Sequence, residues 1–477
     1  MPMAYADAGF ISFYRPTASP EYRYTEWSRE YNSDVLYFKM LNQDVIVLNS
    51  RAASIDLLDK RGSNYCDRPD FILFDIMGFR ATLTFLRWSP RFRMHRKLLQ
   101  SALSKAKITQ YHALQTTEAR RMVRALVARP ENWETLLRRY ATAVVLGVGF
   151  GVSIVSDEDP YIRMAADASY ALGHGGAPAG TLVDFFPLLR YIPECIAPHS
   201  LRFARKWHGA IRRIHEVPFA AVQREVINGT ARASFIREQL EAYDEAAERG
   251  ETSQMSLEDI KGAAGAIYAA GQDTTWSTTV VFVLNMVLHP EVQRRAQQEI
   301  DSVVGADRLP TFSDRPHLPY LEYVLQESLR WCPVSPLGIP HKSLEDDVYR
   351  GMFIPKGSIV YANARAMCHN PSTYSDPEAF DPMRYAPISE GGRGEPYPVG
   401  QFGFGRRICV GRHLADSTLW IIMATILATL GFEKAVGDDG QRITPTVTLT
   451  SGLTSHPEHF PCQVKARCGG VALSAGV

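Results

Sequence analysis

The sequence has no surplus of charge of either sign, since 52 Lys and Arg are balanced by 51 Asp and Glu among 477 residues. A chain this close to neutral lacks the basic surface that nucleic-acid binding requires. Cysteine is also scarce: there are seven, widely spaced and without a CxxC pair. This pattern argues against a disulfide framework or a cysteine-based zinc site, and favours a reducing compartment.

Long apolar runs are missing as well. Residues 1–20 lack the basic start and the apolar core of a secretory signal peptide. The most apolar segments, 280–288 and 417–432, are shorter than the roughly 18–20 residues that a membrane-spanning helix needs. We therefore expect an intracellular protein without a transmembrane segment, in which both segments form buried helices.

Helical periodicity dominates what is present, and the β-runs are short. The sequence predicts a mainly α fold with small β-sheets, in a single domain that spans residues 1–477, with a poorly defined segment at 1–23. Residues 229–255 are polar and are expected to form an exposed loop or a mobile helix end. Helices are predicted at 50–62, 92–128, 133–151, 201–228, 256–289, 291–304, 320–332 and 411–430, and β-runs at 34–49, 347–353 and 358–362.

The segment 402–411 (FGFGRRICVG) gathers several unusual features around Cys409. Its glycines allow tight turns and a close approach to a bulky planar group. The cysteine stands just before a predicted helix, whose positive N-terminal end favours an anionic sulfur. A lone cysteine is more often a buried structural thiol, but this setting favours a thiolate that holds haem iron, with Arg407 bonded to a haem propionate.

This segment resembles the FxxGxRxCxG haem-binding signature of the cytochrome P450 family. All five fixed positions match, and the resemblance extends over residues 24–465, closest in style to fungal microsomal members that depend on a reductase. It implies the cytochrome P450 fold, in which a long central helix and the thiolate loop sandwich haem b, with Cys409 as the axial iron ligand. The matching positions are Phe402, Gly405, Arg407, Cys409 and Gly411.

A second motif, 270–275 (AGQDTT), interrupts the long apolar helix predicted at 256–289. An acid and a hydroxyl inside a buried helix are costly unless they are hydrogen-bonded or used. Asp273 is suited to relay protons and Thr274 to hold a water molecule in a dry pocket. The stretch resembles the family's (A/G)Gx(D/E)T(T/S) motif, which implies that both residues take part in oxygen activation.

Other residues gain meaning from the same resemblance. Glu327 and Arg330 form an ExxR pattern that alone indicates no more than a surface ion pair. With Arg384 of the later PxxFxPxR segment, the resemblance implies a buried structural triad. It also implies that Arg96 and His341 contact haem propionates, although a surface histidine at a strand end is an equally good interpretation of His341. Phe92 replaces the tryptophan of the family's WxxxR motif, which removes one N–H donor.

The resemblance implies a monooxygenase that inserts one oxygen atom from O2 into a lipophilic small molecule, in fungal-type secondary metabolism or xenobiotic oxidation. The chain carries no flavin or nicotinamide fingerprint, so NADPH–cytochrome P450 reductase, with cytochrome b5 as a second donor, would supply the electrons. We expect a monomer. Family members of this kind are bound to the endoplasmic reticulum by an N-terminal helix, which this sequence does not show, so it is either truncated or soluble or peripheral. A basic dock for the reductase is expected at Arg91, Arg93, Lys97, Arg406 and Arg412.

The alternative function is a haem-thiolate isomerase or dehydratase that acts on an oxygenated substrate without external electrons. Such enzymes tend to lose the acid–alcohol pair, so Asp273 and Thr274 argue against this alternative. The same pair argues against a non-catalytic haem sensor, which has no need of proton delivery. The matched glycines around Cys409 argue against a purely structural helical protein.

Overall fold

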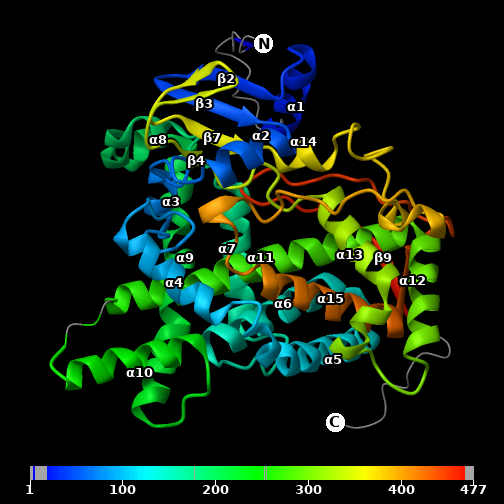
Figure 1. Cartoon of the computed structure of the whole chain (residues 1–477). Helices are drawn as coiled ribbons and strands as arrows, with labels where there is room; N and C mark the ends of the chain where they lie inside the picture. The colour runs from blue at the N-terminus through cyan, green and yellow to red at the C-terminus, as the bar shows by residue number, and fades with distance from the viewer. Residues whose placement is uncertain (1–3, 6–18, 177, 252, 254, 468–477) are drawn as a thin grey trace.

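The computed structural model describes residues 4–5, 19–176, 178–251, 253 and 255–467. It has three small sheets, of which the five-stranded one stands at one side of a larger helical part (Figure 1). The main sheet has five strands in the order β1-β2-β3-β7-β4, and β3 pairs with β7 in parallel. The predicted hairpin at 34–49 is confirmed as β2 and β3. The strands are β1 (Ala4–Tyr5), β2 (Val35–Met40), β3 (Gln43–Leu48), β4 (His341–Lys342), β5 (Asp347–Tyr349), β6 (Met352–Ile354), β7 (Ile359–Ala362), β8 (Leu430–Lys434) and β9 (Cys462–Ala466).

The helices pack around α11 (Leu257–Leu288), which crosses the middle of the molecule in Figure 1. Because neighbours cover it on several sides, α11 is apolar nearly all round rather than along one stripe. The other long helices are α1 (Pro20–Glu30), α4 (Pro90–Ala102), α5 (His112–Ala128), α6 (Trp133–Phe150), α7 (Pro160–His174), α9 (His199–Ile227), α10 (Phe235–Glu248), α12 (Pro290–Val303), α13 (Pro319–Trp331) and α15 (Arg412–Thr429).

The helix predicted at 256–289 is confirmed, and its ends follow from local chemistry. The Ser256 hydroxyl accepts a hydrogen bond from the backbone N–H of Asp259 at 3.1 Å, which caps the first turn. Pro290 follows the last turn and begins α12, since a proline is tolerated at the first position of a helix but not inside it. The helix predicted at 50–62 begins after Ser50 as expected, but its second half is the π-helix η2 (Ile55–Lys60).

Other expectations were wrong in detail. Residues 229–255 were expected to form an exposed loop or a mobile helix end, but they contain the separate helix α10, in which the Ser234 hydroxyl caps the first turn by accepting the backbone N–H of Arg237. The polar composition hid the few apolar residues that bury one face of α10. The run predicted at 92–128 is two helices, α4 and α5, because the chain turns after Leu103. The helix α7 was not predicted.

A large apolar cluster joins α11 to its neighbours, and a smaller cluster lies between the main sheet and η2. The smaller cluster includes Phe404, which anchors the loop before Cys409 against that sheet. Most of the segment 1–23 lies outside the described residues, and α1 begins at its end. Among the residues that the structure describes, no helix is both long enough and apolar enough to cross a membrane.

Candidate active site

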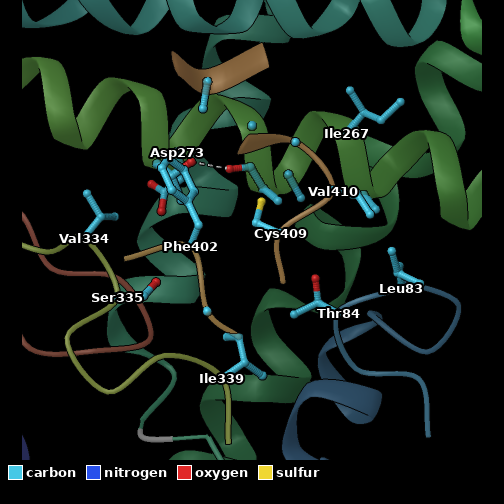
Figure 2. Close-up of a pocket in the computed structure, with 18 of the residues that line it drawn as sticks. Leu83, Thr84, Ile267, Asp273, Val334, Ser335, Ile339, Phe402, Cys409 and Val410 are labelled. Carbon is cyan, nitrogen blue, oxygen red and sulfur yellow. Dashed lines mark hydrogen bonds between the residues drawn. The ribbon is translucent and has the colours of Figure 1, made fainter. Parts of the chain in front are cut away.

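A cavity separates the middle of α11 from the loop that carries Cys409, and Figure 2 shows the cysteine sulfur facing this space. The structure brings together on its walls most of the site residues predicted from the sequence. Gly405 lies behind the loop, and the predicted structural residues Glu327, Arg330 and Arg384 lie outside the wall. The predicted residues that line the cavity are Arg96, Asp273, Thr274, His341, Phe402, Arg407, Cys409 and Gly411.

Cys409 lies deep in the fold, yet its surface is open to the cavity. Burial raises the pKa of its thiol, and hydrogen bonding from the backbone N–H groups of Gly411 and Arg412 opposes that rise. The guanidinium charges of Arg96 and Arg412 also favour the thiolate. The loop is held by the backbone N–H of Cys409, which donates to the carbonyl of Phe402 at 2.8 Å. The sulfur therefore meets the cavity in a setting that supports a metal-bound thiolate.

Gly405 positions the loop from behind. Its backbone has a φ of +53°, a conformation that glycine adopts at little cost. A Cβ atom at this position would lie only 2.0 Å from the carbonyl oxygen of Leu58 in η2. The N–H of Gly405 donates to the Asp59 carboxylate at 2.5 Å. The glycine thus allows the loop to dock against η2, and it does not touch the cavity.

Glu327, Arg330 and Arg384 come together in a fully buried cluster below the loop. The Glu327 carboxylate accepts two hydrogen bonds from Arg330, both at 2.8 Å, and one from Arg384 at 3.0 Å. The backbone N–H of Asp381 and the hydroxyl of Tyr385 also donate to it, each at 2.9 Å. A buried charge of this kind is tolerated only when it is paired and hydrogen-bonded.

The two arginines of this cluster extend its reach into the irregular segment before Cys409. Arg330 donates to the backbone carbonyls of Cys368 at 2.9 Å and Pro377 at 2.7 Å. Arg384 donates to the carbonyl of Ser375 at 3.0 Å and to the carboxylate of Glu395 at 2.6 Å. Side chains of a helix therefore satisfy the carbonyls of a loop that has little regular structure of its own.

One end of the cavity is strongly cationic. Arg96, Arg407 and His341 meet there with Arg68, which the sequence reasoning missed. Burial lowers the pKa of Arg68 and of His341 well below their ordinary values, and it lowers the pKa of Arg407 to about 10. The positive charges of the neighbouring arginines lower these pKa values further. In the described residues, Asp273 is the only acid on the cavity wall, and it belongs to α11.

The cationic groups are only partly satisfied by the protein. Arg407 donates to the carbonyls of Cys66 at 2.6 Å and Leu86 at 2.9 Å, which leaves its buried Nη2 without a partner. Arg68 donates through Nη1 to the carbonyls of Ile339 at 2.7 Å and Pro340 at 2.9 Å, and its buried Nε is likewise unpaired. Buried donors without acceptors are rare, and an anionic group in the cavity would satisfy these two.

Phe92, which stands where the family motif has tryptophan, is buried beneath Arg407. Its ring centre lies 3.6 Å from the guanidinium carbon, so it supports that arginine by a cation–π contact. The ring has no N–H to offer, and Arg68 brings a guanidinium to the same end of the cavity. Arg68 follows Asp67, which forms an isolated bridge with Lys342, and nothing in the sequence alone says that this irregular segment faces the cavity.

The α11 wall carries the polar pair. The Thr274 hydroxyl donates to the backbone carbonyl of Ala270 at 2.8 Å, which leaves its oxygen free to accept a hydrogen bond from the cavity. Asp273 is 1% exposed, and both of its carboxylate oxygens lack a hydrogen bond in the structure. The helix comes close to α6 at Gly271, where a Cβ atom would lie 2.7 Å from Cγ1 of Val145.

The rest of the wall is mainly apolar, with scattered hydroxyl groups. In Figure 2 the loop before α4 supplies Leu83 and Thr84, and the turn after α13 supplies side chains from the opposite side. No lysine lines the cavity in the described part of the chain. The apolar residues of the wall include Leu83, Phe85, Ile267, Val334, Ile339 and Leu453.

Taken together, these features fit haem. A flat, largely apolar ring with two propionates would match a thiolate on one side, an apolar surround and a cluster of arginines at one end. The unpaired N–H groups of Arg68 and Arg407 supply donors for carboxylates. Cys409 would hold the iron, while Arg68, Arg96, Arg407 and His341 would hold the propionates.

Comparison with known proteins gives consistent results. A sequence model of the family described as Cytochrome P450 matches residues 9–460. A cytochrome P450 monooxygenase of Armillaria gallica is 39% identical over 93% of this chain and 87% of its own length. The tryptamine 4-monooxygenase of Psilocybe cyanescens is 34% identical over 95% of this chain and 90% of its own length. A zebra fish cytochrome P450 solved with abiraterone shares the fold at a TM-score of 0.75 and 24% identity, over 94% of this chain and 100% of that one.

Proposed function

The chain belongs to the cytochrome P450 family, and we propose that it inserts one oxygen atom from O2 into a neutral, lipophilic small molecule. It is a haem-thiolate monooxygenase, and its cofactor is haem whose iron is bound by a cysteine thiolate. Its fungal relatives are monooxygenases, so the isomerase or dehydratase alternative is not favoured. Secondary metabolism and xenobiotic oxidation both remain within the proposal.

The observation that carries the proposal is that Asp273 and Thr274 of α11 line the same cavity as Cys409. When bound, haem supplies the activation of dioxygen, which a thiolate ligand promotes by donating electron density. The residues of the chain do the rest. Thr274 holds a water molecule at its hydroxyl oxygen, and Asp273 passes protons from its carboxyl group towards that water. The apolar wall excludes bulk water, so protons reach the site along this route.

The substrate we propose is neutral because, among the described residues on the α11 side of the cavity, Asp273 is the only one with a charge to pair with an ion. Burying an unpaired ion would cost several kcal/mol or more. The relative from Psilocybe cyanescens is named for tryptamine, which carries an amine. In this chain, Asp273 is the only acid among the described lining residues, and its proposed task is proton transfer.

We propose that electrons come from NADPH–cytochrome P450 reductase, assisted by cytochrome b5, at the surface of the endoplasmic reticulum. A hollow behind Cys409 presents Arg93, Lys97 and Arg406. Arg91, which we expected to join this dock, is instead paired with the Asp259 carboxylate at 2.5 Å. An acidic partner would therefore meet the three remaining cations and Arg412.

The reaction is tested with 18O2. The purified holoenzyme is reconstituted with the reductase and NADPH, incubated with a panel of neutral lipophilic compounds, and the products are analysed by mass spectrometry. The proposal predicts products that carry a single 18O atom and form only when NADPH is present. Conversion that needs no NADPH and incorporates no 18O would support the isomerase or dehydratase alternative instead. Matched neutral and amine-bearing compounds test the preference for a neutral substrate.

A further inference from the structure

Asp273 presents a physical problem that the active site alone does not solve. Its side chain is almost completely buried, and neither carboxylate oxygen accepts a hydrogen bond. A carboxylate in such a place is costly to ionise unless an opposite charge lies nearby. A proton donor that works repeatedly also needs a route by which it is recharged from the solvent.

The opposite charge is Arg138, one helix away on α6. Its guanidinium carbon lies 3.5 Å from the ring centre of Trp276, which follows Asp273 by one turn of α11. Burial lowers the pKa of Arg138, and the negative charges of Asp273 and Glu134 oppose that change. Among the described residues, Arg138 forms no direct ion pair with either acid. Its charge therefore acts on Asp273 through space rather than through a hydrogen bond.

Polar groups connect this pair to helix α7. Arg138 donates to the Ser169 hydroxyl at 2.9 Å, and the same hydroxyl accepts a hydrogen bond from the Gln272 amide at 2.7 Å. Gln272 immediately precedes Asp273 on α11. Three helices thus contribute to one polar strip in an otherwise apolar interface, which is the setting in which buried water is found.

The strip continues outward to the surface. Glu134 lies one turn before Arg138 on α6, and its carboxylate accepts a hydrogen bond from Nδ1 of His459 at 2.8 Å. The side chain of Glu134 is 30% exposed and that of His459 is 75% exposed. His456 lies edge-on against Trp276, with ring centres 4.6 Å apart. Titratable groups therefore run from solvent to the edge of the cavity.

We propose that Arg138 is a positioning residue for proton supply: it orients the Asp273 carboxyl group and the water between the two side chains. This inference rests on the proposed role of Asp273 as proton donor. Each insertion of one oxygen atom consumes O2, two electrons from the reductase and two protons, and releases one water molecule. The two protons enter one at a time from the Glu134–His459 surface and pass through the Asp273 carboxyl group.

A purely structural role for Arg138 makes different predictions. Such a role would rest on the contact with Trp276 and the hydrogen bond to Ser169, so any change that weakens them would have similar effects. The Arg138→Met variant keeps the stem of the side chain and removes the charge, whereas Arg138→Lys keeps a positive charge. Arg23→Met is the matched control, because it removes an arginine charge from α1, where the partner Glu26 lies on the same helix.

The experiment uses the four holoenzymes with reductase and a substrate that the wild type oxidises. We expect Arg138→Met to raise the peroxide released per NADPH by about threefold to tenfold, and to increase the solvent deuterium isotope effect on product formation. Arg138→Lys should recover much of the loss, and Arg23→Met should behave as the wild type. Equal peroxide release in Arg138→Met and the wild type would overturn the inference.

A second readout does not depend on turnover. Infrared difference spectra between each enzyme and its Asp273→Asn counterpart isolate the Asp273 carboxyl group. The carboxyl bands of Asp273 are expected to move in Arg138→Met, because the group loses the charge and the ordered water that face it. Unchanged carboxyl bands in that variant would contradict the inference. If Arg138→Met does not fold, Glu134→Gln tests the outer part of the route by the same isotope effect, and an unchanged isotope effect would count against it.

Double variants separate this inference from the function on which it rests. If Asp273 is the proton donor, then Asp273→Asn lowers the amount of product formed per NADPH. Adding Arg138→Met to that variant should then lower this yield only slightly further. A normal Asp273→Asn enzyme would refute the proposed role of Asp273. A defective Asp273→Asn enzyme beside a normal Arg138→Met enzyme would refute only the inference about Arg138.

Discussion

Glu327→Gln should be one of the most damaging nearly isosteric changes in the chain. The carboxylate of Glu327 is fully buried and accepts five hydrogen bonds, three of them from the guanidinium groups of Arg330 and Arg384. The amide keeps the volume but removes the negative charge and turns an NH2 group towards these donors. Two buried guanidiniums are then left without their counter-charge.

The expected loss in the free energy of unfolding follows from the number of charged partners that Glu327 has. Removing one partner of a buried ion pair costs about 3–5 kcal/mol. Because two arginines share Glu327, we expect the upper end of this range, which is a third or more of a typical free energy of unfolding of about 5–15 kcal/mol. The loop that carries Cys409 would lose its support, so little haem-loaded protein should accumulate.

Denaturant unfolding, followed by tryptophan fluorescence, measures this effect. Tyr385→Phe offers a milder version, because it removes a single hydrogen bond to the carboxylate and should cost about 1.5–3 kcal/mol. Glu378→Gln is the matched control: its carboxylate is 67% exposed, and its pair with Arg365 should contribute about 0–1 kcal/mol. A Glu327→Gln variant destabilised by no more than this control would refute the reasoning.

Four further predictions concern single residues. Gly405→Ala should prevent stable haem binding, because its Cβ would lie 2.0 Å from the Leu58 carbonyl oxygen, and normal haem content in the purified variant would count against this. Arg68→Met should speed the transfer of haem to a scavenging protein, and an unchanged transfer rate would exclude Arg68 as a propionate contact. Thr274→Ala should raise peroxide release and lower product per NADPH, and full coupling in that variant would contradict its water-holding role. Burial lowers the pKa of His215 from its ordinary 6.5 to about 4. The contribution of this neutral side chain to the free energy of unfolding is therefore complete above pH 6.5 and decreases by about 3 kcal/mol as the pH falls through 4. Urea titrations between pH 7 and pH 4 should show this decrease in the wild type and not in His215→Gln.

The parts of the site that sequence could predict are those encoded in short patterns. Cys409 with its glycines, and Asp273 with Thr274, each lie within one element, so the spacing along the chain fixes their relative positions. The pair Glu327 and Arg330 lies within a single helix turn, and the structure places both beside Arg384. For these residues, the spacing along the chain largely determines how they lie relative to one another in the structure.

Arg68 and Arg138 show why the rest could not be predicted. Each is an ordinary arginine in sequence, and its surroundings come from segments far away along the chain: Ile339 and Pro340 for Arg68, and Trp276 for Arg138. Arg91 was misassigned for the same reason: it was expected at an open dock, but it is paired with an acid on another helix.

Local composition also misled the prediction of the fold in one place. The segment 229–255 is polar enough to suggest a loop, but a capped helix with one narrow apolar face needs only a few buried residues to form there. Conversely, the strongly apolar 256–289 stretch was easy to assign, since only a buried helix accommodates it. That the whole chain forms a single domain stays a prediction.

The most direct test of the central claim, that Cys409 is the thiolate ligand of haem, is the carbon monoxide difference spectrum of the reduced protein. The wild type and Cys195→Ser, whose cysteine is exposed on η6 (Glu194–Ile196), should both give the thiolate-type band. Cys409→Ser should lose that band even where haem is retained. A thiolate-type band that persists in Cys409→Ser would show that another group holds the iron and would contradict the account.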